Sequence, residues 1–310
     1  MNNQVNKDEL WEYAQSQGFE MMGVAPRERF NGIGPSGHPA VIFPEVKSVI
    51  VVGISIHRGQ YKGTEHGTLW ANADQLVGSK GLMTLCRFIE KSGYEAVPVL
   101  SHKAKFYPKT QPVLPGRELP NVIPSYAYAA VAAGLGEIGY CGLVLTPAFG
   151  PRQSLGMILT DAVMDGDPVF SGRICDHETC KACAEICPSN AISKDKSAEV
   201  EICGKKMTLA DINYNLCRMC QNGAAPDFTY QTGSEEIHQD MIGNQPKINE
   251  VSSVLNKKSV PNIQMALCNR TCIHHLDEKK RLDRSHINPF RTEEPWKLEI
   301  WENRGSKDVY

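Results

Sequence analysis

Residues 175–188 read Cys-Asp-His-Glu-Thr-Cys-Lys-Ala-Cys-Ala-Glu-Ile-Cys-Pro, and this stretch decides how the rest of the chain is interpreted. Its four thiols are separated by four, two and three residues, and a proline follows the last of them. Cysteines at such short spacings that end in Cys-Pro are typical of the ligands of 4Fe-4S clusters. The stretch therefore predicts iron-sulfur chemistry.

Two further pairs of cysteines lie downstream. Cys217 and Cys220 are separated by two residues, and Cys268 and Cys272 by three. With the first stretch they supply eight thiolates, which is enough for two 4Fe-4S clusters. In the two-cluster ferredoxin pattern, the cysteine before the proline ligates the other cluster. This crossover predicts a first ligand set of Cys175, Cys180, Cys183 and Cys272, and a second set of Cys187, Cys217, Cys220 and Cys268.

Disulfides and zinc are the alternatives for a chain with 11 cysteines. Disulfides need an oxidising compartment, and the polar start from Met1 to Leu10 does not resemble a signal peptide. Zinc is satisfied by four ligands, which leaves the Cys-Pro ending unexplained. The usual iron-sulfur spacing also places His177 where a first cysteine is expected, so His177 is an alternative ligand to Cys175. We expect iron-sulfur clusters with Cys175 as the ligand.

Length and charge limit the possible functions. The 310 residues suffice for two domains. Lysine and arginine total 33 against 35 acidic residues, and the net charge of -2 argues against a nucleic acid as partner. No run of 18 or more apolar residues is present, so we expect a soluble cytoplasmic protein without a membrane partner.

The first half of the chain alternates between helical and extended patterns. Helices are expected over Asp8–Gln17, Gly67–Ser92 and Ser125–Ala133, and strands over Phe19–Val24, Val46–Ile56, Ala96–Leu100, Leu143–Thr146 and Ser154–Thr160. The apolar, β-branched run Val46–Ile56 suits a strand buried on both faces. Cys86 lies on the apolar face of the second helix and is expected to be a buried, inert thiol. Residues 101–122 are expected to form an ordered loop.

The second half is less regular. Two short helices are expected after the cysteine motifs, together with a β-rich insertion over Glu199–Met207. Cys203 lies inside that insertion, so we expect a hairpin residue rather than a ligand.

Four glycines, Gly134, Gly136, Gly139 and Gly142, follow the third expected helix. A dinucleotide-binding fingerprint follows a strand and opens a helix, whereas these glycines follow a helix and precede a strand. They therefore argue for close approach of the backbone to a bulky flat ligand rather than for nucleotide binding.

The glycine-rich and cysteine motifs together resemble one superfamily. The segments are Ala-Ala-Gly-Leu-Gly-Glu-Ile-Gly at 132–139, Gly-Leu-Val-Leu-Thr-Pro-Ala-Phe-Gly-Pro-Arg at 142–152, Leu-Thr-Asp at 159–161 and the Cys-Pro stretch. They resemble the epoxyqueuosine reductases and reductive dehalogenases, over most of the chain and most strongly over 125–193. The resemblance implies an α+β fold, in which a nitroreductase-like cobalamin-binding domain (1–167) precedes a ferredoxin-like domain (168–310) with two 4Fe-4S clusters.

The resemblance also implies residues that contact cobalamin. These are Gly134, Leu135, Gly136, Ile138, Gly139 and Gly142. A side chain at Gly136 or Gly139 is expected to intrude on the corrin while lowering the stability of the fold only modestly. The change Gly136→Val is therefore expected to weaken cobalamin binding more than it lowers the melting temperature.

Two departures bear on the choice between the branches. The tRNA-modifying branch carries a catalytic aspartate in an Asp-Ser/Thr-Ala-Pro stretch, where this chain reads Pro-Asn-Val-Ile-Pro at 120–124. The dehalogenase branch uses a tyrosine as proton donor beside an asparagine and a basic residue. Tyr107, Asn121 and Arg152 match that environment, with Lys103 and Lys105 as further positive charge. The twin-arginine signal of exported dehalogenases is not found.

These observations predict a cobalamin-dependent iron-sulfur reductase similar to reductive dehalogenases. It would act on a small organic substrate and receive electrons from an external low-potential donor such as ferredoxin or flavodoxin. One alternative is an epoxyqueuosine reductase that acts on tRNA. Another is a non-catalytic electron-transfer or cobalamin-reducing partner of a second protein.

Overall fold

The protein is described from a computed structural model. The description covers residues 5–34, 37–59, 73–99, 124–187, 190–213, 217 and 267–288, with side chains from 80 and from 268 in the two helices that begin at 73 and 267. Tyr107, Asn121, Cys220 and the expected loop 101–122 lie outside these residues.

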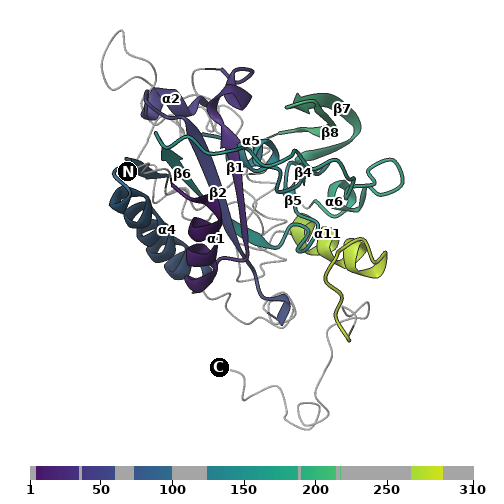
Figure 1. Cartoon of the computed structure of the whole chain (residues 1–310). Coiled ribbons are helices and arrows are strands. Elements are labelled where there is room, and N and C mark those ends of the chain that lie inside the picture. Colours follow the sequence, from purple (N-terminus) through teal and green to yellow (C-terminus); the bar gives the residue numbers. More distant parts are fainter. Residues whose placement is uncertain are drawn as a thin grey trace, which may run out of the picture.

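An antiparallel sheet of four strands forms the centre of the first half (Figure 1). Its spatial order is β1-β2-β6-β3. The bounds are Met21–Pro26 for β1, Ser48–Ser55 for β2, Ala96–Val99 for β3 and Gln153–Thr160 for β6. The β-branched run predicted as a strand is the inner strand β2, and seven of its eight residues are buried. Helices on both faces explain this burial.

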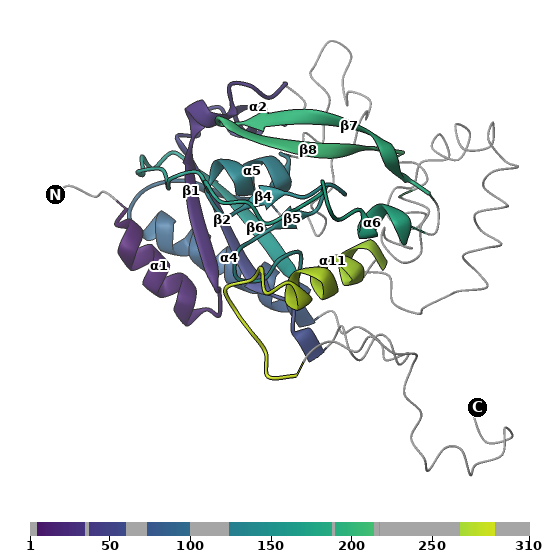
Figure 2. The same cartoon turned by 90° about the vertical axis from the view of Figure 1, so that its right-hand side faces the viewer.

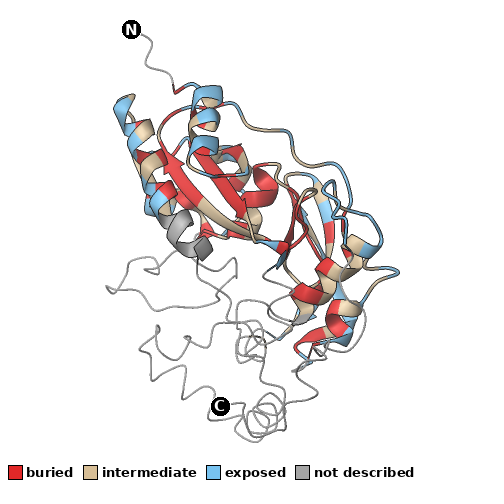
Figure 3. Ribbon diagram, turned by 90° about the horizontal axis from the view of Figure 1, so that it is seen from below, coloured by how far each residue is buried: buried red, intermediate tan, exposed pale blue. Residues whose placement is uncertain are grey.

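The two faces of the sheet carry separate hydrophobic layers. Helices α1 (Lys7–Ser16) and α4 (Ala73–Lys91) cover one face, where Leu10 and Leu85 pack with Ile50 and Ile158. Helix α5 (Tyr126–Ala132) covers the other face, and its alanines pack against Val49, Val51, Met157 and Leu159. Figure 3 shows buried residues along the strands and on the sides of the helices that face them. The mixed α and β content agrees with the predicted fold class.

The other described elements lie outside the four-stranded sheet and the helices that cover it. They are η1 (Arg27–Phe30), α2 (Pro39–Ile42), β4 (Glu137–Ile138), β5 (Val144–Leu145), α6 (Ala182–Glu185), β7 (Ile192–Ile202), β8 (Lys205–Ile212) and α11 (Leu267–Glu278). Strand β4 pairs with β5, and β7 pairs with β8, each antiparallel. The β7-β8 hairpin and α11 lie on opposite sides of the β4-β5 pair (Figure 2).

The predicted elements of the described residues are present, with shifted ends. The first strand begins at Met21 instead of Phe19, because Gly18, at φ +91°, and Phe19 close the end of α1 through hydrogen bonds to Gln15 and Ala14. The expected insertion Glu199–Met207 is a longer hairpin of two strands. Cys203 lies in its turn at φ +52°, as expected of a hairpin residue.

Cys86 is buried, as predicted. Burial raises the pKa of its thiol to about 12, and the charge of Glu90 acts in the same direction. A thiol with such a pKa stays protonated at neutral pH and is inert as a nucleophile.

Helix α11 is fixed against residues from the first half of the chain. Arg58 Nη2 lies 2.9 Å from Asp277 Oδ2, and both side chains are largely buried. Asn269 Nδ2 donates to the carbonyl of Pro151 at 3.4 Å. These contacts place Cys268 and Cys272 beside the first cysteine stretch.

Among the helices of the described residues, none combines the length and apolar character that a membrane crossing requires.

Candidate iron-sulfur site

Seven of the eight predicted cluster ligands fall within the described residues, and the fold brings them together. Cys183 and Cys187 are buried in one apolar cluster with Ala184, Ala191 and Ile192. Cys175, Cys217 and Cys268 pack against the same cluster. Cys175 also packs, together with Cys272, against a neighbouring cluster formed by Leu145, Ile174 and Leu276. Thiols from three segments of the chain therefore meet at one buried place.

The first predicted ligand set is close enough for its thiols to affect one another. Burial raises the pKa of Cys272 well above its ordinary value, and the charges of Cys183, Cys175 and Cys180, together with that of Cys268, raise it further. Burial likewise raises the pKa of Cys175 to about 11. Buried thiolates that repel one another are stabilised by a cationic centre, which favours their deprotonated form. This arrangement fits an iron-sulfur cluster.

Backbone N–H groups are directed at several of these sulfurs. Tyr140 N donates to Cys175 Sγ at 3.4 Å, and Ala191 N donates to Cys187 Sγ at 3.3 Å. Cys180 and Cys183 accept from the backbone of Ala182 and Ala184, at the start of α6. Such bonds favour the thiolate form and fix the orientation of each sulfur.

The buried carboxylate of Glu137 holds the start of the cysteine stretch. Its Oε1 accepts the backbone N–H of Ile174 at 2.8 Å and of Cys175 at 2.6 Å. Its Oε2 lies 3.2 Å from Lys205 Nζ, and both side chains are at most 10% exposed. Glu137 therefore links β4, the cluster loop and β8.

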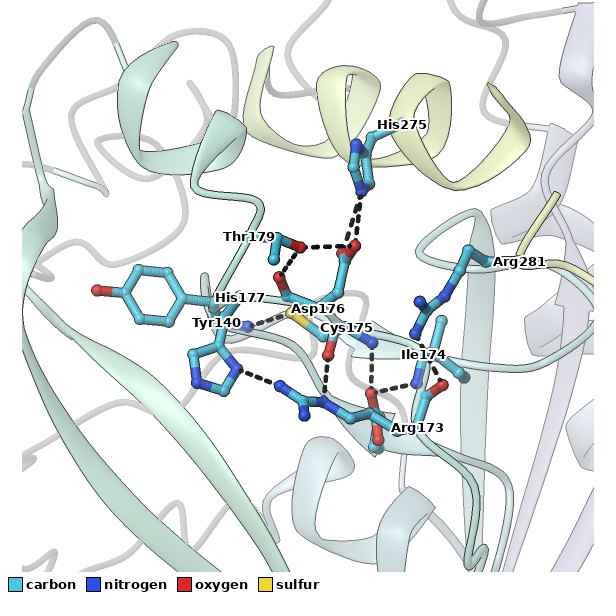
Figure 4. Close-up of polar contacts among 10 residues, drawn as sticks. Tyr140, Arg173, Ile174, Cys175, Asp176, His177, Thr179, His275 and Arg281 are labelled. Carbon is cyan, nitrogen blue, oxygen red and sulfur yellow. Dashed lines mark hydrogen bonds and ion pairs between the residues drawn. The ribbon is translucent and has the colours of Figure 1, made fainter. Parts of the chain in front are cut away.

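A second polar group joins the loop to α11 (Figure 4). His275 Nε2 lies 3.0 Å from Asp176 Oδ1, and Thr179 Oγ1 donates to Asp176 Oδ2 at 3.2 Å. Burial raises the pKa of Asp176, but the hydrogen bond and charge of His275 outweigh it and hold the pKa below its ordinary value. A carboxylate oxygen of Asp176, the sulfur of Cys180 and a ring nitrogen of His275 all lie within 4.8 Å of one another.

His177, the alternative to Cys175, lies in a different environment. Its ring stacks on Tyr140 with centroids 5.8 Å apart, and its Nδ1 is 3.4 Å from Arg173 Nη2. Cys175 instead accepts backbone N–H groups from Tyr140 and His177. This geometry favours Cys175 as the ligand.

The glycine-rich segment packs against the chain itself. A Cβ at Gly134 would lie 2.2 Å from the carbonyl oxygen of Pro168, and one at Gly136 would lie 1.9 Å from that of Leu145. A Cβ at Gly139 would meet the side chain of Leu145 at 2.8 Å, and Gly142 needs its φ of +79° for a turn. The expectation that a side chain at Gly136 lowers stability only modestly is therefore wrong, because the backbone of β5 fills that space.

The two apolar residues of the segment are also packed within the protein. Leu135 lies against the core layer beneath α5, and Ile138 packs with Val131, Ile202 and Met207. The chain itself therefore fills the space where a Cβ of residue 134 or 136 would lie, and the role of this segment in cobalamin binding stays a prediction.

Arg152, the described member of the predicted catalytic set, is 4% exposed. Its Nη1 donates to the carbonyl of Ile56 at 2.7 Å, and its guanidinium lies 5.2 Å from the centroid of Phe149. These contacts fix the segment before β6. Tyr107 and Asn121 lie outside the described residues, so the catalytic set stays a prediction.

Two residues at the site were not singled out from the sequence. Glu137 lies between Gly136 and Gly139 of the glycine-rich motif, and the motif does not indicate that its carboxylate contacts Ile174 and Cys175. Cys141 follows Tyr140 in the same segment and packs against the apolar cluster that contains Cys183 and Cys187. The signal for Cys141 was a cysteine beside a segment already linked to the site by resemblance.

Comparison with known proteins finds the two families of the predicted resemblance. The chain is 31% identical over 151 residues to the tetrachloroethene reductive dehalogenase of Sulfurospirillum multivorans, covering 48% of this chain and 26% of that protein. It is 29% identical over 157 residues to the epoxyqueuosine reductase of Synechocystis sp., covering 49% of this chain and 47% of the relative. The predicted resemblance is confirmed. The matches span about a quarter and about half of the relatives' own lengths.

The chain was also compared with solved structures. A reductive dehalogenase described with a mechanism for B12-dependent dehalogenation matches with a TM-score of 0.50 and 18% identity, covering 86% of this chain and 37% of that chain. An epoxyqueuosine reductase with a tRNA-Tyr stem loop matches with a TM-score of 0.44 and 15% identity, covering 73% and 60%. At these identities the likeness concerns the fold alone. No protein-family model matches the chain.

Proposed function

We propose that this protein is an oxidoreductase similar to reductive dehalogenases, with two 4Fe-4S clusters and cobalamin, that reduces a small organic substrate. The convergence of thiols from residues 175–187, Cys217 and α11 on one buried site carries the proposal. The relatives found by sequence are reductases, which supports redox chemistry at these thiols.

The proposal assigns the thiols to two sets. Cys272 of α11 lies within reach of the charges of Cys175, Cys180 and Cys183, and also of Cys268 in its own helix, so its place in the first set is proposed on the sequence pattern. Cys183 and Cys187 share one apolar cluster, and Cys175, Cys217 and Cys268 pack against it, so the second set is likewise proposed on the sequence pattern. Cys220 completes that set on the sequence pattern alone.

The clusters would relay single electrons at potentials from roughly -700 mV upward, and cobalamin would supply the reactive cobalt. The chain's own contribution is to orient the sulfurs. The N–H groups of Tyr140 and Ala191 and the carboxylate of Glu137 fix the loop that carries them. An external low-potential donor, such as ferredoxin or flavodoxin, would supply the electrons.

Cobalamin enters the proposal through the resemblance and through the B12-dependent structural neighbour. The division into a cobalamin-binding domain (1–167) and an iron-sulfur domain (168–310) belongs to the same proposal. No corrin contact is assigned to the described residues. Tyr107, with Asn121 and Arg152, is proposed as the source of the proton.

The test is anaerobic purification with analysis of iron, sulfide and cobalt. We expect about eight irons per chain and a corrinoid-binding signal in a difference spectrum. Cys180→Ser and Cys272→Ser are expected to remove the same electron paramagnetic resonance (EPR) signal, whereas Cys187→Ser and Cys268→Ser remove the other. Fewer than about six irons after reconstitution, or no corrinoid binding, contradicts the proposal.

Turnover separates the proposed function from its alternatives. Halogenated and epoxide compounds are screened with a low-potential reductant, and reduction of a small halogenated compound supports the proposal. Loss of queuosine from tRNA in a deletion strain supports a tRNA substrate instead, as in the epoxyqueuosine reductases. A stable complex with a corrinoid methyltransferase, without turnover alone, supports an electron-transfer partner.

A further inference from the structure

Tyr140, in the turn between β4 and β5, contacts the start of the cysteine loop at two points (Figure 4). Its backbone N–H donates to Cys175 Sγ at 3.4 Å. Its ring stacks on that of His177, with centroids 5.8 Å apart and an angle of 2° between the planes. His177 stands where the usual iron-sulfur spacing has a cysteine, and here it provides a flat surface for the tyrosine.

The side chain of Tyr140 is itself held in place. It is buried, and its Oη donates to the carbonyl of Ser193 in β7 at 3.1 Å. Its own carbonyl accepts the N–H of Ala210 in β8 at 2.8 Å. On the other side of the stack, Arg173 Nη2 lies 3.4 Å from His177 Nδ1. The β7-β8 hairpin and the ring of His177 therefore fix Tyr140 together.

We infer that Tyr140 is a positioning residue of the proposed iron-sulfur site. Its side chain holds its own N–H on the sulfur of Cys175, and this hydrogen bond raises the reduction potential of the cluster that Cys175 ligates. The inference deepens the proposed function and rests on its 4Fe-4S clusters. It makes the turn between β4 and β5 part of the electron-transfer site, although this turn supplies none of the predicted ligands.

The direction of the effect follows from charge. Reduction adds negative charge to the cluster and its ligand sulfurs, and an N–H directed at a ligand sulfur stabilises that charge. Substitution cannot remove a backbone N–H, but it can remove the ring and the hydroxyl that fix its position. When the N–H of residue 140 moves away from Cys175 Sγ, the reduced cluster loses a donor and the potential falls.

The first experiment tests the hydrogen bond in the wild-type protein. The protein is labelled with nitrogen-15 tyrosine, purified anaerobically with its clusters and reduced. Pulsed EPR then detects a labelled amide nitrogen that donates to a ligand sulfur, through its magnetic coupling to the cluster. We expect such a coupling in the wild type. We expect it to be lost in Tyr140→Phe, where residue 140 carries no label.

The second experiment tests the side chain. Tyr140→Phe keeps the ring on His177 but loses the hydroxyl, and Tyr140→Leu loses both. Tyr128→Phe is the matched control, because Tyr128 Oη also donates to a backbone carbonyl, that of Arg29, at 2.8 Å. Iron content and the midpoint potential of each cluster are measured, the latter by EPR during a redox titration. The EPR signal that changes in Cys175→Ala identifies the cluster that Cys175 ligates.

We expect the variants of Tyr140 and Tyr128 to keep the iron content of the wild type. In Tyr140→Leu the potential of the Cys175 cluster shifts to a more negative value, and that of the other cluster stays unchanged. In Tyr140→Phe the shift has the same direction but is smaller, because the ring remains. Tyr128→Phe changes neither potential.

Three outcomes would overturn the inference. The absence of a nitrogen coupling in the labelled wild type would do so even if Tyr140→Leu does not fold. Unchanged potentials in the Tyr140 variants would reduce the residue to a packing role, and equal shifts of both clusters would indicate a general disturbance. A wild-type protein without 4Fe-4S signals contradicts the proposed function itself, which separates that failure from the failure of this inference.

Discussion

The carboxylate of Glu137 accepts the backbone N–H of Cys175 at 2.6 Å. A residue of the glycine-rich motif thus fixes the first cysteine of the cluster loop, although the two lie far apart in the sequence. Lys205 Nζ, 3.2 Å from the other carboxylate oxygen, compensates the buried charge. The two motifs that suggested the resemblance are therefore one structural unit.

Replacing Glu137 is expected to loosen this unit. Glu137→Gln removes the charged acceptor and places an amide beside Lys205, so we expect a loss of about 1.5–3 kcal/mol in the free energy of unfolding. The cluster that contains Cys175 should also lose iron faster when a chelator is added. Thermal unfolding and iron release under anaerobic conditions measure both effects.

The control for this change is Glu199→Gln on the exposed part of β7. In the double variant Glu137→Gln/Lys205→Met, part of the lost stability should return, because no charge is left unpaired. Additive effects of the two changes would show that the ion pair does not couple them.

A side chain at Gly136 is expected to disrupt the fold. In Gly136→Ala the new Cβ would lie 1.9 Å from the carbonyl oxygen of Leu145, so β5 must move away from β4. We expect a loss of at least about 1–3 kcal/mol in stability, or insoluble protein. Gly34→Ala is the control, since a Cβ there meets no atom within 4 Å. Equal melting temperatures for the two variants would contradict the close approach.

Acid should release the contact between Glu20 and the segment after α11. Burial raises the pKa of Glu20, but hydrogen bonds from Ser55 and Arg284 outweigh it and lower the pKa. A lowered pKa means that the contact stabilises the protein above the unfolded value of about 4.3 and is lost as the pH falls through the folded value. Since the pair is solvent-exposed, we expect at most about 1 kcal/mol.

Urea unfolding of wild type and Glu20→Gln at several pH values tests this. The variant should be less stable at neutral pH and equal to the wild type once Glu20 is protonated in both states. Glu12→Gln, on the exposed side of α1, serves as control. A difference that persists at low pH would contradict the charge-based explanation.

Tyr107→Phe is expected to keep iron and corrinoid but to lose turnover. A general acid typically contributes about 10² to 10⁴-fold in rate, and this change removes the phenolic proton. The test measures the rate at which the variant reduces the substrate. Tyr13→Phe, in α1, is the control. If Tyr107→Phe stays within about threefold of the wild type while Asn121→Ala loses activity, the proton reaches the substrate by another route.

The sequence predicted those parts of the structure that depend on local patterns. The strand at Ser48–Ser55 was predicted from a β-branched apolar run, and the burial of Cys86 was predicted from its place on the apolar face of a helix. Strand β7 was predicted too short because most of its side chains are exposed, so its first residues lack the alternation that marks a half-buried strand.

The parts that could not be predicted depend on contacts between distant segments. Glu137 fixes the cluster loop only because Ile174, Cys175 and Lys205 lie beside it in the fold. No spacing within the glycine-rich motif indicates these three contacts. The same holds for the space beside Gly136, which β5 fills. Glycines that accommodate a ligand and glycines that accommodate a neighbouring strand are alike in sequence.

Through helix α11, the proposed clusters would link distant segments of the chain to one another. It is anchored to Arg58 and Pro151, and it carries Cys272 to the loop that holds Cys183. Iron bound by both thiols would close the intervening chain into a ring, as a disulfide does, and would restrict the unfolded ensemble. Binding of iron would then complete the folding of the cysteine-rich half. This step requires Cys272, so it can occur only after α11 has been synthesised and has left the ribosome.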